Sequence, residues 1–89
     1  MMAQEPVVGD MCPWGEVTGV RKMMPGIIYV STASHGGLWL SEINLTKMTW
    51  GDRYFAADWS HGWGDHWWEE DCAVARVEKV FDFKGSGEK

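Results

Sequence analysis

The sequence predicts a small α+β domain, in which a three-stranded antiparallel sheet packs against one main helix near the C-terminus. A turn dipeptide, Pro25-Gly26, precedes a β-branched and aromatic run at residues 27–32, which is typical of a β-hairpin. An amphipathic segment over residues 66–80 has its acidic residues before its basic ones, as an α-helix prefers. The 89 residues contain no internal repeat, so we expect one domain spanning residues 1–89.

The N-terminal half predicts the three strands of the sheet. Residues 1–13 contain two prolines and a glycine and are expected to form an extended, partly ordered arm. Residues 16–23 alternate loosely between apolar and polar side chains, which indicates a strand. The turn at 24–26 joins this strand to the strand at 27–32, and Leu38–Leu40 predicts a short third strand.

The connection between the second and third strands is rich in glycine. The segment Ser34-His35-Gly36-Gly37 predicts a tight turn whose glycines are free to adopt positive φ. After the third strand, Ser41 is placed to cap a short helix that ends near Met48. Residues 54–58 fit a strand or an irregular segment equally well.

The last element is expected to be a helix from about residue 66 to residue 80. Three consecutive acids at 69–71 would lie in its first turns, where carboxylates favour a helix N-terminus, and Lys79 would lie near its end. Residues 73–83 also alternate partly in the manner of a strand, so a strand remains the alternative there. Residues 84–89 are rich in glycine and charge and predict a flexible tail.

Composition limits the class of protein. The apolar fraction of 45% and the seven tryptophans indicate a folded chain, because disordered segments contain few aromatic residues. The formal net charge of -5 argues against direct binding to nucleic acid, which requires a clustered basic face. It favours a partner protein that has a basic surface. A core this small also leaves a homodimer open.

Nothing in the sequence indicates secretion or membrane insertion. The N-terminal residues lack the basic start and apolar run of a signal peptide, and no apolar stretch approaches the ~18 residues of a membrane span. The two cysteines, Cys12 and Cys72, make no disulfide framework and are expected to be free thiols. We therefore expect a soluble, cytoplasmic protein.

One segment concentrates residues that are suited to recognition. Between Arg53 and Arg76 there is no positive residue, but there are five acids and six aromatic residues. Interfaces favour tryptophan and tyrosine at their centre, with charges around them that set specificity. Gly62 and Gly64 would let the loop that contains them adapt to a partner. The expected binding residues are Asp58, Trp59, Trp63, Asp65, Trp67, Glu69, Glu70 and Asp71.

The same segment invites a catalytic or metal-binding interpretation, which its spacing weakens. Its histidines, acids and cysteine match no established zinc pattern. Cys72 follows three acids, which disfavour the thiolate that a nucleophile needs. Consecutive acids on a helix diverge by about 100° per residue, so they do not converge on one substrate atom. We expect no metal, no cofactor and no enzymatic activity. The alternative is a small metal- or Cys/His-dependent hydrolase built on His35, His66, Glu69 and Cys72.

Two stretches resemble motifs of one family. Residues 28–41, IYVSTASHGGLWLS, resemble the V-x-T-P-S-H-G-G-x-x-L-S stretch of an uncharacterised domain family met in phage and plasmid proteins. Residues 67–72, WWEEDC, resemble that family's W-Y-E-E-D-C stretch. The chain departs from the pattern at Ala33, where proline is usual, and at Trp68, where tyrosine is usual. The resemblance implies a mobile-element context and suggests that the two stretches touch in the fold.

By size and charge the chain is also similar to small phage inhibitors of CRISPR effector complexes, many of which offer carboxylates where phosphates would sit. We therefore expect a non-enzymatic counter-defence inhibitor that acts in the cytoplasm of the host cell. It would bind a basic, nucleic-acid-binding surface of a host complex. The loop at residues 59–66 departs from the family and is expected to be the centre of the binding surface. A hydrolase of a mobile element is the alternative function.

Overall fold

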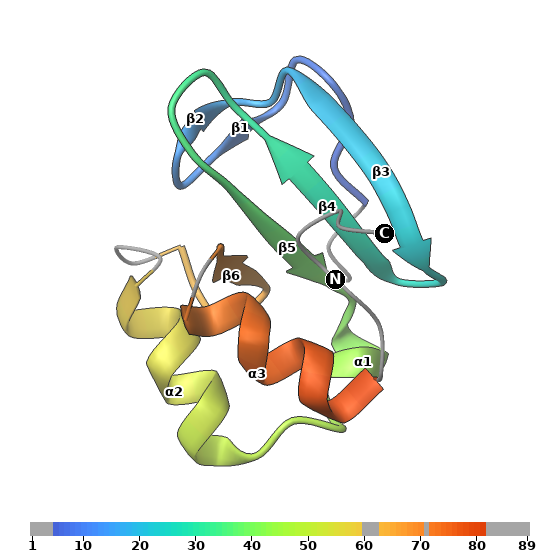
Figure 1. Ribbon diagram of the computed structural model, residues 1–89, viewed down its shortest axis with the longest axis vertical. Helices are drawn as coiled ribbons and strands as arrows, with labels where there is room; N and C mark the ends of the chain where they lie inside the picture. The colour runs from blue at the N-terminus through green and yellow to red at the C-terminus, as the bar shows by residue number, and fades with distance from the viewer. Residues whose placement is uncertain (1–4, 60–62, 71, 82–89) are drawn as a thin grey trace.

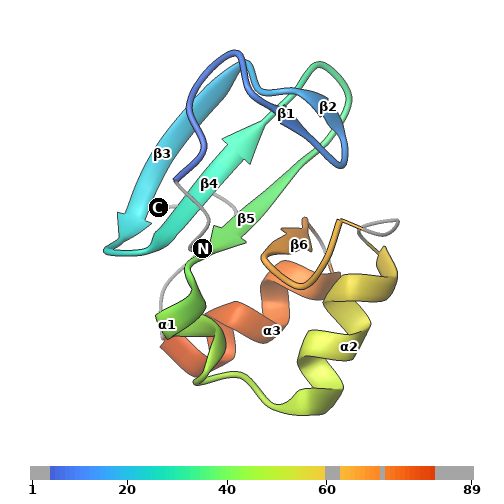
Figure 2. The same cartoon turned by 180° about the vertical axis from the view of Figure 1, so that it is seen from behind.

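The computed structural model describes residues 5–59, 63–70 and 72–81, and it has an α+β fold, as predicted (Figure 1). A four-stranded antiparallel sheet has the strand order β3-β4-β5-β6, and a separate hairpin pairs β1 with β2. The helices gather beside β5 and β6, away from the β1–β2 hairpin (Figure 1 and Figure 2). The elements are β1 (Met11–Cys12), β2 (Gly15–Glu16), β3 (Gly19–Met24), β4 (Ile27–Ser31), β5 (Gly36–Leu40), α1 (Glu42–Leu45), α2 (Trp50–Trp59), β6 (Trp67–Glu69) and α3 (Cys72–Phe81).

The predicted hairpin of β3 and β4 is confirmed. The two strands pair antiparallel along their length, with a bulge between Lys22 and Met24. Gly26 takes a φ of 79° in the turn, a value that glycine adopts without strain. Ser41 donates its backbone N–H to the Gly26 carbonyl oxygen at 2.8 Å. The hairpin turn and the start of α1 are therefore joined directly.

The two central strands bury both of their faces. In β4, Ile27 and Ile28 are both buried, although adjacent side chains of a strand point to opposite faces of the sheet. In β5, Leu38, Trp39 and Leu40 are all buried as well. A continuous apolar run is what a strand covered on both sides requires. Each face of the sheet therefore has its own core.

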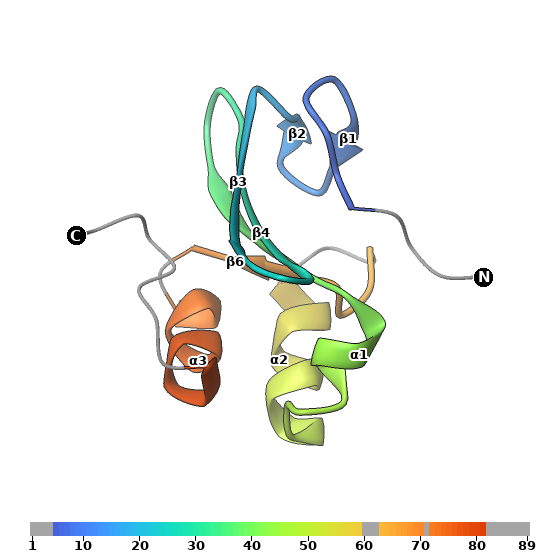
Figure 3. The same ribbon diagram turned by 90° about the vertical axis from the view of Figure 1, so that its right-hand side faces the viewer.

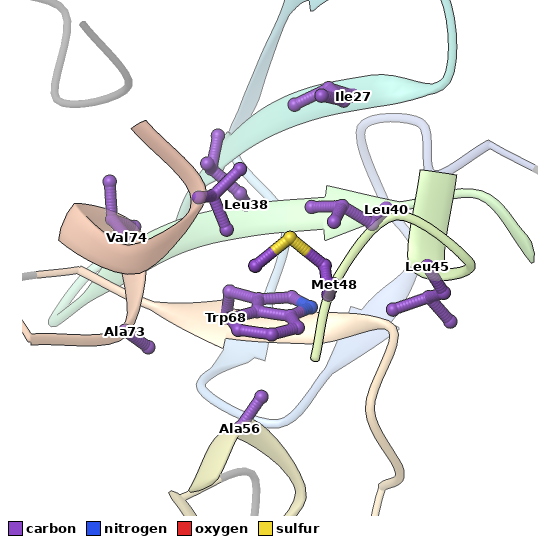
Figure 4. Packing of buried hydrophobic residues seen from close by; sticks show 10 residues of the cluster. Ile27, Leu38, Leu40, Leu45, Met48, Ala56, Trp68, Ala73 and Val74 are labelled. Atoms are coloured by element: carbon purple, nitrogen blue, oxygen red, sulfur yellow. The ribbon is translucent and has the colours of Figure 1, made fainter. Parts of the chain in front are cut away.

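One core lies between the sheet and the helices, around the fully buried side chain of Trp68. Figure 4 shows Met48 and Ala56 on either side of its indole, so the ring is enclosed by the α1–α2 connection and by α2. The other core lies between the sheet and the β1–β2 hairpin. The helix-side core comprises Ile27, Leu38, Leu40, Leu45, Met48, Ala56, Trp68, Ala73, Val74 and Val77, and the hairpin-side core comprises Cys12, Val17, Ile28, Val30, Trp39 and Trp67.

The main sheet has four strands and not the predicted three, because residues 67–69 form a strand and not part of a helix. In β6, Trp68 lies opposite Leu38 and Trp67 lies opposite Trp39. Side chains alternate in a strand, so the two adjacent tryptophans enter the two different cores. In a helix the two rings would point only about 100° apart and would not reach both faces of the sheet. The burial of two large rings outweighs the charge order that favours a helix.

The C-terminal helix begins later than the sequence predicts. α3 spans Cys72–Phe81, so the predicted helix is confirmed from residue 72 to residue 80, and the strand alternative is wrong as far as Phe81. The helix lies beside α2, near β6 (Figure 3), and buries Ala73, Val74 and Val77. Residues 84–89, for which the sequence predicts a flexible tail, lie outside the described residues.

Residues 54–58 lie in a second long helix, α2. The prediction of a strand or an irregular segment at these residues is therefore wrong. The sequence predicts one main helix and one short helix, and the described residues form three helices. Thr49 begins α2, because its hydroxyl oxygen accepts the N–H of Asp52 at 3.1 Å and its carbonyl oxygen accepts the N–H of Arg53 at 2.9 Å. Threonine at this position is a favourable N-cap, and an aspartate three residues later suits the first turn. This local signal indicates the helix.

The predicted cap of the short helix is confirmed. Ser41 Oγ accepts the backbone N–H of Asn44 at 3.3 Å, and α1 ends at Leu45, earlier than the expected end near Met48. At the other end of the chain, β1 and β2 follow the first described residues, and Cys12 of β1 is buried in the hairpin-side core. Among the described residues, no helix has the length and apolar character needed to cross a membrane.

Candidate protein-binding surface

The stretch at residues 28–41 lies beside residues 67–70 of the second stretch, so the prediction that the two stretches touch is confirmed. Gly37 of β5 pairs with Glu69 of β6. The backbone N–H of Glu70 donates to the Gly36 carbonyl oxygen at 2.9 Å and extends the same ladder. These contacts join backbone groups of neighbouring strands, so both stretches form the framework of the sheet.

The two glycines at the start of β5 provide space and do not use the positive φ that glycine permits. Neither is among the described glycines with positive φ, and both lie in an extended strand. A Cβ on Gly37 would overlap the Trp68 carbonyl oxygen and lie 2.5 Å from Cη2 of Trp14. A Cβ on Gly36 would lie 2.8 Å from the Tyr29 hydroxyl oxygen. Close approach of β6 to β5 therefore depends on the absence of a side chain at Gly37, whereas Gly36 leaves room for Tyr29 of β4.

Thr32 holds the turn between β4 and β5. Its hydroxyl oxygen accepts the backbone N–H groups of Ser34 and His35 at 3.3 and 3.1 Å. The same hydroxyl donates to the His35 carbonyl oxygen at 2.8 Å, and so does the backbone N–H of Thr32. His35 contributes to this turn through its backbone, while the residue is exposed. The turn is thus stabilised by one threonine.

The alternative hydrolase places His35 and His66 in one site, and the fold puts them at opposite ends of β5. His35 directly precedes the strand, whereas Leu40 at its far end donates its N–H to the His66 carbonyl oxygen at 2.8 Å. Five strand residues span about 17 Å. Within residues 5–59, 63–70 and 72–81, no three His, Cys, Asp or Glu side chains are grouped to hold a metal ion. The side chain of Cys72 lies outside the described residues.

The expected binding residues have very different environments. Trp67 is 9% exposed and packs in the hairpin-side core, so it is a core residue and no surface anchor. Trp63 is 49% exposed and contacts Trp67 edge to face, with ring centroids 6.4 Å apart. Asp58 is exposed on α2. Asp71 and the side chain of Trp59 lie outside the described residues.

Asp65 forms an ion pair with Arg53. Its Oδ2 accepts from Arg53 Nε at 2.7 Å, and the two side chains are only 25% and 23% exposed. The Asp65 carbonyl oxygen accepts the indole N–H of Trp68 at 2.8 Å. The Arg53 guanidinium also lies over the ring of Trp50, 4.5 Å from its centroid. Asp65 therefore fastens its loop to α2 and to the helix-side core.

Glu69 and Glu70 are half-buried at the end of β6 and in the turn after it, and not in the first turn of a helix as predicted. Glu70 accepts a hydrogen bond from the Tyr29 hydroxyl at 3.4 Å. Burial raises the pKa of the Tyr29 hydroxyl, and the adjacent negative charge of Glu70 raises it further. These two acids therefore belong to the sheet, where Glu70 already has a partner.

The most exposed aromatic side chains of the described residues lie on α2. Trp50 is 77% exposed and Tyr54 is 82% exposed. Asp58, also exposed, completes the same face, because residues four apart are neighbours along the surface of a helix. We refer to Trp50, Tyr54 and Asp58 as the α2 face. Sequence reasoning finds Asp58 but misses the two aromatics, since only a helix beginning near Thr49 aligns all three.

Comparison with known proteins places the chain in one family. A family model described as a domain of unknown function, DUF7007, matches residues 8–88. The chain belongs to the DUF7007 family. No curated protein and no solved structure matches the chain significantly. The DUF7007 match includes every strand and helix described above, so the β1–β2 hairpin and the α2 face are both part of the family domain.

Proposed function

We propose that this DUF7007 domain is a non-enzymatic inhibitor that binds a basic, nucleic-acid-binding protein of a host defence complex. It covers the surface that the nucleic acid would occupy. The proposal is carried by the α2 face, where Trp50 and Tyr54 are 77% and 82% exposed beside an exposed Asp58. The role in counter-defence rests on the resemblance to phage and plasmid proteins.

The two exposed rings favour a protein partner. Each can bury roughly 150–250 Å² in an interface. Binding energy in protein interfaces concentrates on tryptophan, tyrosine and arginine. The Arg53 guanidinium stacks on Trp50 and limits the orientations of its ring, which reduces the entropy lost on binding. A helix fixed to the core by Ala56 thus presents anchors that are oriented before the partner arrives.

The charge of the chain supports a basic partner. The formal net charge is -5, and Asp58 forms no ion pair with a described residue. Charges around the centre of an interface accelerate association with an oppositely charged surface and disfavour partners of like charge. A carboxylate beside two aromatic anchors would take the position of a phosphate on the partner.

A competition experiment tests the proposal. The domain captures proteins from a nuclease-treated bacterial host lysate, and the captured protein is purified and loaded with labelled nucleic acid. We expect the wild-type domain to displace that nucleic acid. The Trp50→Ala/Tyr54→Ala double variant should displace it at least about tenfold less effectively, because it lacks both anchors.

Met11→Ala is the matched control, because Met11 is 60% exposed on the β1–β2 hairpin and lies outside the α2 face. This variant should displace nucleic acid as well as the wild type does. Asp58→Lys should weaken displacement more at low salt than at high salt, since salt screens exposed charges. A partner that keeps its nucleic acid in the presence of the wild-type domain contradicts the proposal, and so does an equally effective double variant.

A further inference from the structure

A polar pocket of about 280 Å³ lies between α1, α2 and the loop before β6. Its lining residues are Glu42, Leu45, Thr46, Arg53, Asp65 and His66. Arg53 links the pocket to the α2 face, because the guanidinium that pairs with Asp65 also lies over Trp50. The pocket therefore adjoins the surface to which we assign partner binding.

His66 is held in one orientation at this pocket. Its Nδ1 lies 2.7 Å from the Leu40 carbonyl oxygen, and since a carbonyl only accepts hydrogen bonds, Nδ1 carries a proton. The ring also stacks on Trp39, with centroids 6.0 Å apart and an angle of 14° between the planes. In the neutral imidazole, Nε2 then has a free lone pair and acts as an acceptor.

The other polar groups that line the pocket also offer acceptors. The Thr46 hydroxyl donates its proton to the Ile43 carbonyl oxygen at 2.6 Å and retains its lone pairs. Asp65 uses Oδ2 for Arg53, which leaves its second carboxylate oxygen. Glu42 is exposed and forms no ion pair with a described residue. The cation of the lining set, Arg53, is already engaged by Asp65.

We propose that this pocket receives the ammonium group of a lysine side chain from the partner protein. An ammonium has three donors and no acceptor, which matches a set of acceptors. The pocket has two carboxylates, from Glu42 and Asp65, and one guanidinium, from Arg53. Its net charge is therefore negative when His66 is neutral. Leu45 supplies an apolar wall for the aliphatic stem of the lysine. This inference rests on the proposed function, because it names the residue type that the basic partner inserts beside the α2 face.

A titration without any partner protein tests the pocket. Nα-acetyl-lysine N-methylamide is added to the isotope-labelled domain, and the backbone amide signals are followed by NMR. We expect saturable shifts centred on Glu42, Thr46 and His66, with a dissociation constant in the millimolar range that so small a ligand allows. Nα-acetyl-norleucine N-methylamide, which has a similar stem without the charge, should bind at least about tenfold more weakly.

Glu42→Gln should weaken binding of the lysine amide about fivefold or more, because it removes a carboxylate and keeps the shape of the side chain. Glu16→Gln removes an exposed carboxylate on β2, away from the pocket, and should bind the amide as the wild type does. Equal binding of the two amides, or an unchanged affinity in Glu42→Gln, overturns the inference. Such a result leaves the proposed function standing. A failed competition experiment removes the partner but does not change binding of the lysine amide, so the two failures are distinguishable.

Discussion

β6 and α2 are both rich in large aromatic residues, but they place them in opposite environments. In β6, Trp67 and Trp68 are 9% and 0% exposed and fill the two cores. In α2, Trp50 and Tyr54 are 77% and 82% exposed. The exposure of these rings depends on the surrounding elements and not on the residue type. β6 is covered on both faces, whereas α2 is covered on one. Changes in β6 should therefore affect the free energy of unfolding, and changes on the α2 face should affect binding.

The largest effect on stability is expected at Trp68. Trp68→Ala removes a fully buried indole and its hydrogen bond to Asp65, and should lower the free energy of unfolding by about 3–5 kcal/mol. Domains are stable by only about 5–15 kcal/mol, so this is a large share of the total. Urea denaturation followed by circular dichroism measures the change.

Two further variants test whether the loss of stability in Trp68→Ala comes from the burial of its ring. Trp68→Phe keeps part of the buried ring and should lose less stability than Trp68→Ala. Trp50→Ala, at a ring that is 77% exposed, should change the free energy of unfolding by no more than about 0.5 kcal/mol. Similar losses at Trp50 and Trp68 would remove the contrast between α2 and β6.

Alanine substitutions at two glycines should change the free energy of unfolding in opposite directions. Gly37→Ala should lower the free energy of unfolding by about 1–3 kcal/mol, because its Cβ would overlap the Trp68 carbonyl oxygen and crowd Trp14. Gly51→Ala, in α2, should raise it by about 0.5–1 kcal/mol, since alanine favours a helix and the nearest atom to the new Cβ is 3.9 Å away. Thermal unfolding of both variants measures the signs. A fully stable Gly37→Ala would mean that β6 does not pack closely on β5.

Alkaline pH should lower the free energy of unfolding, because Cys12 and Tyr29 then lose their protons. Burial raises the pKa of the Cys12 thiol and outweighs the backbone hydrogen bonds that lower it, and burial with the Glu70 charge raises the pKa of the Tyr29 hydroxyl. Each group keeps its proton in the folded chain at a pH where the unfolded chain releases it. The stability they contribute is therefore complete below the unfolded pKa and is lost as the pH rises through the folded pKa.

The measurement is the urea midpoint as a function of pH, from about pH 7 to about pH 10.5. The midpoint should decline above about pH 8.5, the ordinary pKa of a cysteine thiol. Cys12→Ser and Tyr29→Phe should each make the decline shallower, Tyr29→Phe at the higher pH values. A wild-type midpoint that stays constant over this range is the opposite of what burial of these two groups requires.

Local signals make part of the fold predictable from the sequence. The hairpin of β3 and β4 follows from Pro25-Gly26 and the β-branched run after it, and the start of α1 follows from the Ser41 cap. Thr49 with Asp52 three residues later is a similar local signal for α2, although residues 54–58 are expected to be a strand or irregular. Such signals depend on a few neighbouring residues, so they are visible before any tertiary contact is known.

β6 and the proposed binding surface are less predictable because they depend on distant parts of the chain. The strand at residues 67–69 packs closely on β5 because Gly37 leaves room for it, and a sequence does not show which segment fills that room. The acids near β6 indicate a helix when they are considered alone. Asp58 is exposed as expected for a binding residue, whereas Trp67 is buried because β5 and the hairpin cover it.

Hydroxyl-radical footprinting with mass spectrometry tests the central claim most directly, because one experiment reports the exposure of every aromatic ring. In the isolated domain, Trp50 and Tyr54 should oxidise much faster than Trp67 and Trp68. In the complex with the captured partner, Trp50 and Tyr54 should become protected. Rapid oxidation of Trp67 and Trp68 in the folded domain, or a partner that leaves Trp50 and Tyr54 fully reactive, would contradict the assignment of β6 to the core and of the α2 face to binding.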